Sequence, residues 1–461
     1  MLEVTKLKAI SPLDGRYRDS VEPLAEYLSE SALIFYRLEV EIKYLEALSK
    51  AGIIRKLSKS EILELNKIFE NKSDENAIKI KHYEDEVKHD VKSVELFLRE
   101  VFKGKSVENI IEKLHYCLTS EDVNNIAYRL MIINALCNLI LPAIKDFILQ
   151  LSKFADQNKN MVMMARTHGQ DAIPTTLGKE MSVFAVRLAD VYKKIKEFKL
   201  TGKLNGAIGG WNSHVFAESK LDWMKFSKNF VESFRLKYNE FTSQINPYDD
   251  IVELLSLFHL FNSILLDFNQ DMWRYISDGW LIQKVDKNQV GSSTMAQKVN
   301  PINFENSEGN IQVANGLIES LSRILPVSRL QRDLSNSTVI RNVSTIFAHE
   351  VLIVNGASSG LSKVSPDKEE IADYLNSNWS ILAEPLQILL RKYDTQDAYN
   401  IVKEKTMGKK MNEKEWKKLI KSMKIKKSII NKALKISVNN YIGYCSNITH
   451  DAVKYINNIL N

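Results

Sequence analysis

The residues best suited to chemistry gather in one polar stretch, residues 291–310, which reads GSSTMAQKVNPINFENSEGN. Gly291 permits backbone angles that are closed to other residues, and the backbone N–H groups after it can hold a developing negative charge. Lys298 can neutralise a carboxylate, and Asn300 can hydrogen-bond to it. The stretch therefore predicts a loop that handles an anion. The alternative is a polar loop whose Ser and Asn side chains only cap the next helix.

This stretch resembles the signature loop of the fumarase/aspartase superfamily of lyases, whose usual pattern is GSSxMPxKxNP. The match covers Gly291, Ser292, Ser293, Met295, Lys298, Asn300 and Pro301. Ala296 stands where the superfamily usually has proline, and Gln297 is the residue that argininosuccinate lyases carry at that position. The resemblance implies a β-elimination that releases fumarate, with Ser292 as the general base. Because serine is a weak base on its own, the loop must stabilise its alkoxide through backbone N–H groups and Lys298.

A histidine that could serve as the acid lies in residues 166–170, RTHGQ. Histidine is the side chain best suited to donate a proton near neutral pH. Gly169 and Pro174 are expected to break the backbone before a helix from about Thr176 to Leu200. The alternative for His168 is a structural core histidine. By resemblance, His168 is the general acid that protonates the departing nitrogen.

Two further motifs come earlier. Residues 88–92, KHDVK, lie in a helical region predicted over 73–102, and by resemblance Lys88, His89 and Asp90 contact the substrate. The superfamily usually has asparagine at Lys88, and the alternative for His89 is a structural role. In residues 119–125, TSEDVNN, the spacing predicts a capped helix start, which is a ready anion site. By resemblance, Thr119 and Ser120 bind the succinyl carboxylates.

Residues 325–342, LPVSRLQRDLSNSTVIRN, hold three arginines and several hydroxyls. Such a set suits a phosphomonoester better than a plain dicarboxylate; the alternative is a solvated basic helix face. The segment SPLDGRY ends in an Arg-Tyr pair that could clamp a phosphate or stack on a base, unless its arginine is simply a surface residue. The full set of substrate contacts that the resemblance implies is Arg16, Tyr17, Lys88, His89, Asp90, Thr119, Ser120, Gln244, Lys298, Asn300, Asn306, Arg332, Ser337, Thr338 and Arg341.

Four stretches, SPLDGRY, TSEDVNN, PINFENSEGN and LPVSRLQRDLSNSTVIRN, resemble the bacterial members of the superfamily that act on a succinylated purine nucleotide. The expected reactions release fumarate from adenylosuccinate, giving AMP, and from the succinyl-aminoimidazole carboxamide ribotide of purine biosynthesis. Two alternatives remain. Gln297 suggests argininosuccinate lyase or another fumarate-releasing member, and Ala296 leaves open a non-catalytic structural relative.

Composition narrows the class of protein. The 461 residues include only 17 Gly and 9 Pro, which favours long helices, and the net charge of +6 does not indicate a nucleic-acid partner. The three cysteines have no metal-ligand spacing, and the glycine-rich run 203–212 lacks the lysine-serine pair of a phosphate loop. We therefore expect no metal and no cofactor. The polar N-terminus and the lack of about 18–20 consecutive apolar residues predict a cytoplasmic protein with no membrane partner.

The expected fold is all-α, in three consecutive parts: an N-terminal helical domain (1–112), a central domain of very long helices (113–363) and a C-terminal helical domain (364–461). One central helix is predicted to open in residues 242–250, TSQINPYDD, and run to about Val285, and Pro142 is expected to kink another. The lysine-rich tail between Lys403 and Lys427 is interpreted as a solvated face. Helices of this length that are apolar on more than one face imply bundling between chains. The superfamily forms homotetramers with active sites shared between chains, and the resemblance implies the same here.

Overall fold

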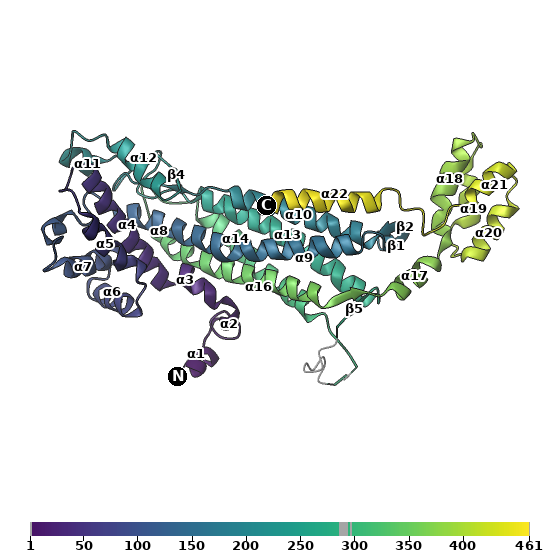
Figure 1. The fold of residues 1–461 in the computed structure, drawn as a ribbon, viewed down its shortest axis with the longest axis horizontal. Coiled ribbons are helices and arrows are strands. Elements are labelled where there is room, and N and C mark those ends of the chain that lie inside the picture. The colour runs from purple at the N-terminus through teal and green to yellow at the C-terminus, as the bar shows by residue number, and fades with distance from the viewer. Residues whose placement is uncertain (1, 285–293, 296, 461) are drawn as a thin grey trace. The chain divides into compact units, whose positions relative to one another are not determined.

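The computed structural model describes residues 2–284, 294–295 and 297–460 (Figure 1). Helices dominate the chain, and the sheets formed by the described residues are three two-stranded pairs: β1 with β2, β3 with β4, and β5 with β6. The prediction of an all-α fold is confirmed.

Contacts divide the chain into two compact units. Unit 1 comprises Met1–Ala143, Lys194–Asn262 and Asn310–Ile353, and unit 2 comprises Ile144–Lys193, Ser263–Gly309 and Val354–Asn461. The boundaries fall within long helices, so each unit is assembled from separate pieces of sequence. The division into three consecutive parts is a different description and stays a prediction.

Five long helices contribute to both units: α9 (Leu141–Gln157), α10 (Leu177–Glu197), α13 (Asp249–Ser277), α14 (Ile302–Ile324) and α16 (Val343–Ser362). The other elements of unit 1 are α1 (Leu2–Leu7), α2 (Arg18–Val21), η1 (Glu22–Leu24), α3 (Ala25–Leu28), α4 (Glu30–Lys50), α5 (Lys59–Glu70), α6 (Asp74–Val87), α7 (Asp90–Phe102), η2 (Glu108–Lys113), α8 (Ser120–Ala135), η3 (Leu136–Ile140), β3 (Thr201–Gly202), α11 (Asn212–Ala217), α12 (Trp223–Ser233), β4 (Lys237–Tyr238), α15 (Ser335–Val339) and η4 (Ile340–Asn342). The other elements of unit 2 are β1 (Val162–Thr167), β2 (Gln170–Thr176), β5 (Leu281–Gln283), β6 (Val364–Pro366), α17 (Lys368–Asn376), η5 (Trp379–Leu382), α18 (Ala383–Lys392), α19 (Ala398–Thr406), α20 (Glu413–Ser422), α21 (Lys427–Ala433) and α22 (Cys445–Leu460).

The core of unit 1 is built on α4 and α8, which pack against each other. The side chain of Ser29 accepts a hydrogen bond from the Ala32 N–H at 3.1 Å and so caps the start of α4. Apolar residues recur at helical spacing along α4, and Leu38, Ile42 and Leu45 are fully buried. This face of α4 thus holds α8, whose first turn carries the predicted TSED motif.

The core of unit 2 is an aromatic cluster supplied by four long helices. Phe268 of α13 lies with its ring centroid 5.8 Å from Phe147, 5.7 Å from Phe184 and 6.0 Å from Phe304, each edge to face. Gly360 lets α16 approach this cluster, because a Cβ at that position would come 2.7 Å from the Phe304 ring. Burying an aromatic side chain of this size contributes about 1.5–3 kcal/mol, so this cluster fixes the helices that carry the hairpin of RTHGQ and the start of α14.

Several boundaries differ from those predicted. The region 73–102 is two helices, because Lys88 is in the left-handed conformation (φ 54°) and ends α6, and His89 caps the start of α7. Helix α13 ends at Ser277 rather than near Val285, because Gly279 (φ 77°) turns the backbone into β5. Pro142 follows a π-helical turn, η3, that joins α8 to α9. Such a turn is a common way for a helix to accommodate a break in its regular hydrogen bonds, such as the one that proline causes.

Two helical stretches, Ser120–Gln157 and Asp249–Ser277, are long and apolar enough by length and composition to cross a membrane, so the sequence criterion of consecutive apolar residues was too strict. Buried core helices meet the same criterion, and 44% and 50% of the most apolar windows are buried within the fold. Both stretches also carry buried polar side chains, including Arg129 and Asn262. These features fit core helices. The part of each apolar window that is not buried stays uncovered within one chain.

Candidate active site

The start of helix α8 is closed by a buried aspartate. The backbone N–H of Thr119 donates to Asp122 Oδ2 at 2.9 Å, as the capping spacing predicts. Ser120 is the first helical residue, so its N–H lies at the positive end of the helix dipole. Thr119 and Ser120 thus lie at a helix N-terminus of the kind that binds carboxylates and phosphates.

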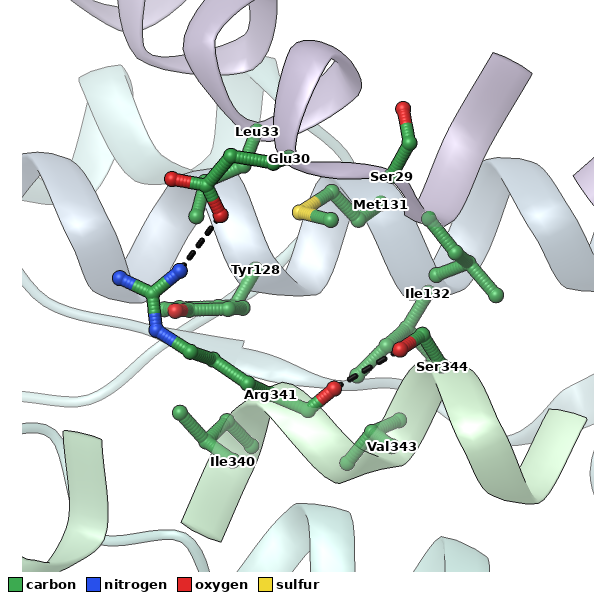
Figure 2. Close-up of a pocket in the computed structure, with 11 residues that line it drawn as sticks. Ser29, Glu30, Leu33, Tyr128, Met131, Ile132, Ile340, Arg341, Val343 and Ser344 are labelled. Atoms are coloured by element: carbon green, nitrogen blue, oxygen red, sulfur yellow. Dashed lines mark hydrogen bonds and ion pairs between the residues drawn. The ribbon is translucent and has the colours of Figure 1, made fainter. Parts of the chain in front are cut away.

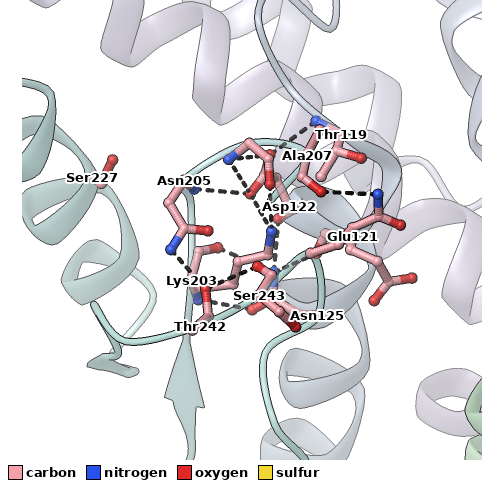
Figure 3. A network of polar contacts seen from close by, with 12 residues as sticks. Thr119, Glu121, Asp122, Asn125, Lys203, Asn205, Ala207, Ser227, Thr242 and Ser243 are labelled. Atoms are coloured by element: carbon pink, nitrogen blue, oxygen red, sulfur yellow. Dashed lines mark hydrogen bonds and ion pairs between the residues drawn. The ribbon is translucent and has the colours of Figure 1, made fainter. Parts of the chain in front are cut away.

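Asp122 also fixes the glycine-rich run beneath this helix start (Figure 3). Its carboxylate accepts hydrogen bonds from the backbone N–H groups of Asn205, at 3.0 Å, and of Gly206, at 3.2 Å. Lys203 Nζ lies 3.0 Å from Asp122 Oδ1, and both side chains are fully buried. The capping spacing predicts the bond between Thr119 and Asp122 but not this ion pair, because a lysine in a glycine-rich run gives no local sign of its partner 81 residues away.

The same run packs tightly against the segment that carries Gln244. Gly209 has φ +78°, and a Cβ there would come within 2.2 Å of the Thr242 carbonyl oxygen, so only glycine fits. Asn205 Nδ2 donates to Thr242 Oγ1 at 2.7 Å. These contacts bring residues 242–244 to the start of α8.

A second set of predicted contacts meets around Arg332. Its guanidinium donates to Gln244 Oε1 at 3.1 Å and to Ser337 Oγ at 3.4 Å. The same guanidinium forms an ion pair of 3.0 Å with Glu121, whose side chain is 4% exposed. Gln244 Nε2 donates to the Ala207 carbonyl oxygen at 3.0 Å. The structure therefore brings Gln244, Arg332 and Ser337 together at the first turn of α8.

From Glu121 the polar contacts continue through residues that the sequence analysis missed. Asn124 Nδ2 donates to Glu121 Oε1 at 3.3 Å, and Asn124 Oδ1 accepts from Arg37 Nε at 2.8 Å. Arg37 is 1% exposed and forms an ion pair with Asp90. The available signal was an arginine among the apolar residues of α4, because an arginine that is buried there must be paired.

The last predicted arginine, Arg341, closes this set of contacts (Figure 2). Its guanidinium lies 3.8 Å from Asp90 Oδ2 and donates to Glu30 Oε2 at 2.5 Å. Burial alone would raise the pKa of Asp90, but Arg37, the Val91 N–H and Arg341 outweigh it and hold that pKa below its usual value. We call this connected set the arginine network; its members are Gln244, Arg332, Glu121, Asn124, Arg37, Asp90, Arg341 and Glu30.

A pocket of about 190 Å³ lies beside Arg341 (Figure 2). Apolar side chains from α3, α4, α8, η4 and α16 form most of its wall, and the polar part is supplied by Ser29, Glu30, Tyr128, Arg341 and Ser344. Ligand pockets usually measure about 300–1,000 Å³. This pocket is therefore too small to enclose a whole nucleotide within unit 1 alone.

The remaining predicted contacts of unit 1 lie at turns and helix ends. His89 Nδ1 accepts from the Lys92 N–H at 3.2 Å, so this histidine caps α7 while 51% of its side chain stays exposed. The Arg16 guanidinium lies 5.9 Å from the ring centroid of Tyr17. Thr338 is exposed on α15. Arg329, the third arginine of its segment, is 82% exposed and pairs with Asp333 at 3.2 Å instead of joining the arginine network.

In unit 2, His168 lies at the tip of a β-hairpin rather than in a loop between helices. Thr167 pairs with Gln170, and the two residues between them have positive φ, 54° for His168 and 71° for Gly169. This is the backbone pattern of a tight type I′ turn, which matches the twist of the strands. The hairpin was not predicted, although an X-Gly pair after the run VMMART is a typical signal for it.

The hairpin is anchored on both strands. Arg166 forms an ion pair with Asp278, and its guanidinium lies 4.3 Å from the Trp280 ring centroid. On the opposite strand, Asp171 accepts hydrogen bonds of 2.9 Å from the Tyr374 hydroxyl and from Asn378 Nδ2. The exposed imidazole of His168 is thus presented to solvent on a rigid support.

The predicted catalytic loop is described only in part, because Ser292, the assigned base, lies outside the described residues, as do Gly291, Ser293 and Ala296. Lys298 is exposed, and its N–H donates to the Met295 carbonyl oxygen at 3.1 Å. Asn300 is half-buried, directly before Pro301 and the start of α14, and Asn306 is exposed on the first turns of that helix. His168, Lys298, Asn300 and Asn306 belong to unit 2, whereas the arginine network belongs to unit 1.

Metal-ligating side chains do not cluster in the part of the chain that the structure describes. No group of three or more His, Cys, Asp or Glu side chains there is arranged to hold a metal ion. The three cysteines are free thiols.

Comparison with solved structures defines the class of fold. The fold is similar to that of a fumarate lyase from Mesorhizobium sp. BNC1, with a TM-score of 0.76 and 16% identity over 95% of this chain and 97% of that chain. It is equally similar to the 3-carboxy-cis,cis-muconate lactonizing enzyme from Pseudomonas putida, with a TM-score of 0.76 and 18% identity over 95% and 98% of the two chains. A family model described as "Lyase" matches residues 15–316. This is the fold and family of the fumarase/aspartase lyases.

Sequence similarity identifies the branch. A model described as "Adenylosuccinate lyase C-terminal" matches residues 328–442. The adenylosuccinate lyase of Buchnera aphidicola subsp. Schizaphis graminum is 42% identical over 97% of this chain and 99% of its own. Those of Legionella pneumophila strain Corby and Escherichia coli K12 are 39% and 38% identical, over 97% and 96% of this chain. The chain belongs to the adenylosuccinate lyase family and is an enzyme of the lyase class.

Proposed function

We propose that this protein releases fumarate from adenylosuccinate, giving AMP, and from the succinyl-aminoimidazole carboxamide ribotide of purine biosynthesis. The observation that carries the proposal is the arginine network. It ties Arg332 and Arg341, with the Ser337 hydroxyl, to helix α8, whose N-terminus is itself suited to an anion. Arginine binds phosphate oxygens in bidentate fashion, so the network supports a phosphate-bearing substrate rather than a plain dicarboxylate.

The reaction is a β-elimination. A base removes the proton next to a carboxylate, the C–N bond breaks, and an acid protonates the departing nitrogen. We assign His168 as the acid; its exposure on an anchored hairpin supports a role at the reacting atoms. We assign Ser292 as the base on the strength of the signature motif. Lys298 and Asn300 would hold the carboxylate that takes up the carbanion's charge, at about 3–4 kcal/mol per donor.

The remaining assignments concern the rest of the substrate. Thr119 and Ser120 would receive succinyl carboxylates at the α8 N-terminus, and Gln244 would contact the nucleotide. The other proposed contacts are Arg16, Tyr17, Lys88, His89, Asp90, Asn306 and Thr338. No metal or cofactor is assigned a role.

We further propose that the protein works in the cytoplasm as a homotetramer, with sites shared between chains and with no nucleic-acid or membrane partner. Uncovered apolar side chains on the long helices support association. In unit 2 these include Leu149 (38% exposed) and Trp273 (43%), and in unit 1 Leu260 (44%) and Val313 (49%). The pocket beside Arg341 holds only about 190 Å³, which also supports a site completed from elsewhere.

The first test measures fumarate release from adenylosuccinate, argininosuccinate and aspartate by the purified protein. We expect release from adenylosuccinate and none from the other two. His168→Ala is the control for contaminating lyase and should be nearly inactive. Release from argininosuccinate instead, or from none of the three, would show that the proposed function is wrong.

A second test asks whether acid and base come from different chains. His168→Ala and Ser292→Ala are prepared separately, unfolded together and refolded as mixed tetramers. Random mixing leaves about a quarter of shared sites with both groups intact, so activity should rise far above either parent. If mixed tetramers form and stay as inactive as the parents, His168 and Ser292 act within one chain.

A further inference from the structure

The lysine-rich segment 398–435 carries more positive charge than the whole chain. It holds 13 Lys, no Arg and 3 Glu, which gives it a net charge of +10, whereas the full sequence has +6. The rest of the chain therefore has a net charge of −4. Charge concentrated in this way creates a local positive potential that attracts anions. A merely solvated surface does not account for this concentration.

Three helices of unit 2 carry this charge: α19, α20 and α21. Their inner sides are packed, because α18 contacts α19 and α21, and α20 contacts α21 and η5 (Figure 1). Val402, Trp416 and Ile420 are buried there. Most of the lysines are exposed on the outer side. The basic surface therefore belongs to helices that have a core of their own.

A hollow of about 550 Å³ lies on this surface, between the end of α19, the loop that follows it and one face of α20. Ligand pockets usually measure about 300–1,000 Å³, so the hollow is large enough for a small molecule. Four lysines, one carboxylate, one hydroxyl and two apolar side chains line it: Lys405, Lys409, Lys410, Lys418, Glu415, Ser422, Met411 and Leu419.

The four lysines of this hollow lack a counter-ion. In the part of the chain that the structure describes, none of them forms an ion pair, whereas Lys417, also on α20 but outside the hollow, pairs with Glu413. The one carboxylate in the lining is already engaged, because Glu415 accepts the Asn412 N–H at 2.9 Å and completes the capping box of α20. Like charges gathered in this way repel one another. A bound anion would relieve that repulsion.

The loop that carries two of these lysines is held in a defined shape. Gly408 turns the backbone at the end of α19 with φ 70°. The Met411 carbonyl oxygen accepts the Trp379 N–H at 2.6 Å, which ties the loop to η5. Lys409 and Lys410 lie between these two fixed points. Binding an anion there therefore has to order only lysine side chains and not the backbone, which lowers the cost of binding.

The chemistry of the lining favours a compact polyanion. Lysine binds phosphate as a flexible point charge, and four lysines around one hollow match the several charges of a polyphosphate group better than a single phosphate. A single-stranded nucleic acid fits less well, because such ligands are bound by stacking on exposed aromatic side chains as well as by charge. The lining contains no aromatic side chain, and Trp416 of α20 is 2% exposed.

We infer that this hollow binds a compact polyphosphate group, either free or as the triphosphate of a nucleotide. Lys405, Lys409, Lys410 and Lys418 supply the positive charge that holds it. None of the four is assigned a part in fumarate release, so the inference does not depend on the proposed function. Exposed charge pairs are individually weak and are screened by salt, so each lysine should account for a factor of about 1.5–5 in Kd.

The test is isothermal titration of the purified protein with inorganic triphosphate at low salt. The test variant removes the four lining charges with Lys405→Gln, Lys409→Gln, Lys410→Gln and Lys418→Gln. The matched control removes the same charge from exposed lysines of the same segment outside the hollow, with Lys424→Gln, Lys426→Gln, Lys427→Gln and Lys435→Gln. We expect Kd to rise at least about tenfold in the test variant and less than about twofold in the control. Circular dichroism and thermal unfolding establish that both variants are folded.

Two further ligands complete the experiment. Binding of ATP at least as tight as that of inorganic triphosphate identifies a nucleotide as the ligand, and weaker binding of ATP identifies the free polyphosphate; either result supports the site. The inference is wrong if inorganic triphosphate does not bind the wild type, or if test and control variants lose the same affinity, because general attraction then explains the binding. It is also wrong if a single-stranded oligonucleotide binds more tightly than triphosphate, which would make this surface a nucleic-acid site. The single variant Lys418→Gln should raise Kd by about 1.5–5-fold, and an unchanged Kd there would remove α20 from the site.

Discussion

The buried pair Lys203–Asp122 offers a sharp test of how the site is built. Both side chains are fully buried, and Lys203 Nζ has two acceptors, Asp122 Oδ1 at 3.0 Å and the Gly206 carbonyl oxygen at 3.1 Å. At an effective dielectric constant of about 20, two charges 3.0 Å apart attract by about 5–6 kcal/mol. Desolvation offsets much of this, but removing one partner of such a pair typically costs about 3–5 kcal/mol.

The two single substitutions should not be equal. Lys203→Met leaves the carboxylate with the N–H groups of Thr119, Asn205 and Gly206, so its cost should lie near 3 kcal/mol, the lower end of the range of about 3–5 kcal/mol. Asp122→Asn leaves a buried ammonium with no counter-charge, and its amide group cannot accept from all the backbone N–H groups that the carboxylate served, so its cost should lie near the upper end. The double variant should cost less than the sum, because no unpaired charge remains.

Urea and thermal unfolding of the purified protein at fixed concentration measure these costs. With about 2.1 cal/mol/K of unfolding entropy per residue, a chain of 461 residues loses about 1 °C in Tm per kcal/mol, hence about 3–5 °C. A larger shift is expected if unit 1 unfolds by itself. Lys228→Met, on the exposed side of α12, is the matched control and should stay within about 0.5 kcal/mol. If both single variants lower the free energy of unfolding by less than about 1 kcal/mol, removing one partner does not leave a costly unpaired charge, and the argument is refuted.

Three further predictions concern pH, substrate binding and metal. Burial raises the pKa of Glu350 to about 8, whereas the same carboxyl in the unfolded chain titrates near 4.5, so the folded state binds more protons between these pH values. The free energy of unfolding should therefore fall as pH rises from 5 to 8. In urea titrations, Glu350→Gln should reduce this dependence on pH. Glu30→Gln should lower KM for adenylosuccinate by a factor of about 1.5–5, because it frees Arg341 from a half-exposed pair worth about 0.2–1 kcal/mol; an increase in KM would contradict this. A metal chelator should leave the rate of fumarate release unchanged, and a loss restored by added metal would overturn that expectation.

The parts of the fold that could be predicted from the sequence are those set by neighbours in the chain. The capping box of Ser58 and Glu61 and the helix start at Ser120 follow from three-residue spacings, and both are present. The end of α13 was placed too late, because the left-handed backbone at Gly279 outweighs the apolar periodicity. The hairpin at His168 was missed, because Gly169 and Pro174 were interpreted only as breaks in the backbone before a helix.

The candidate site divides in the same way. Motif residues such as Arg332, Arg341 and Asp90 were found by resemblance, but the pairing of the arginines with Glu121 and Glu30 was not. Glu121 belongs to the predicted helix start TSEDVNN but was assigned no partner. Arg37 was not predicted at all, because its partners Asp90 and Asn124 lie 53 and 87 residues away. Pairings at such separations are set by the packing of α4 on α8, which no local pattern reports.

Those long-range partners determine what the predicted arginines can do. Glu121, which pairs with Arg332, is 4% exposed and also accepts from Asn124, so it is held in place. Glu30, which pairs with Arg341, is 42% exposed and begins a helix. Because water and salt weaken an exposed pair far more than a buried one, a phosphate competes more easily for Arg341 than for Arg332. We therefore expect Arg332 to orient groups within a fixed frame and Arg341 to exchange its carboxylate partner for the substrate's phosphate.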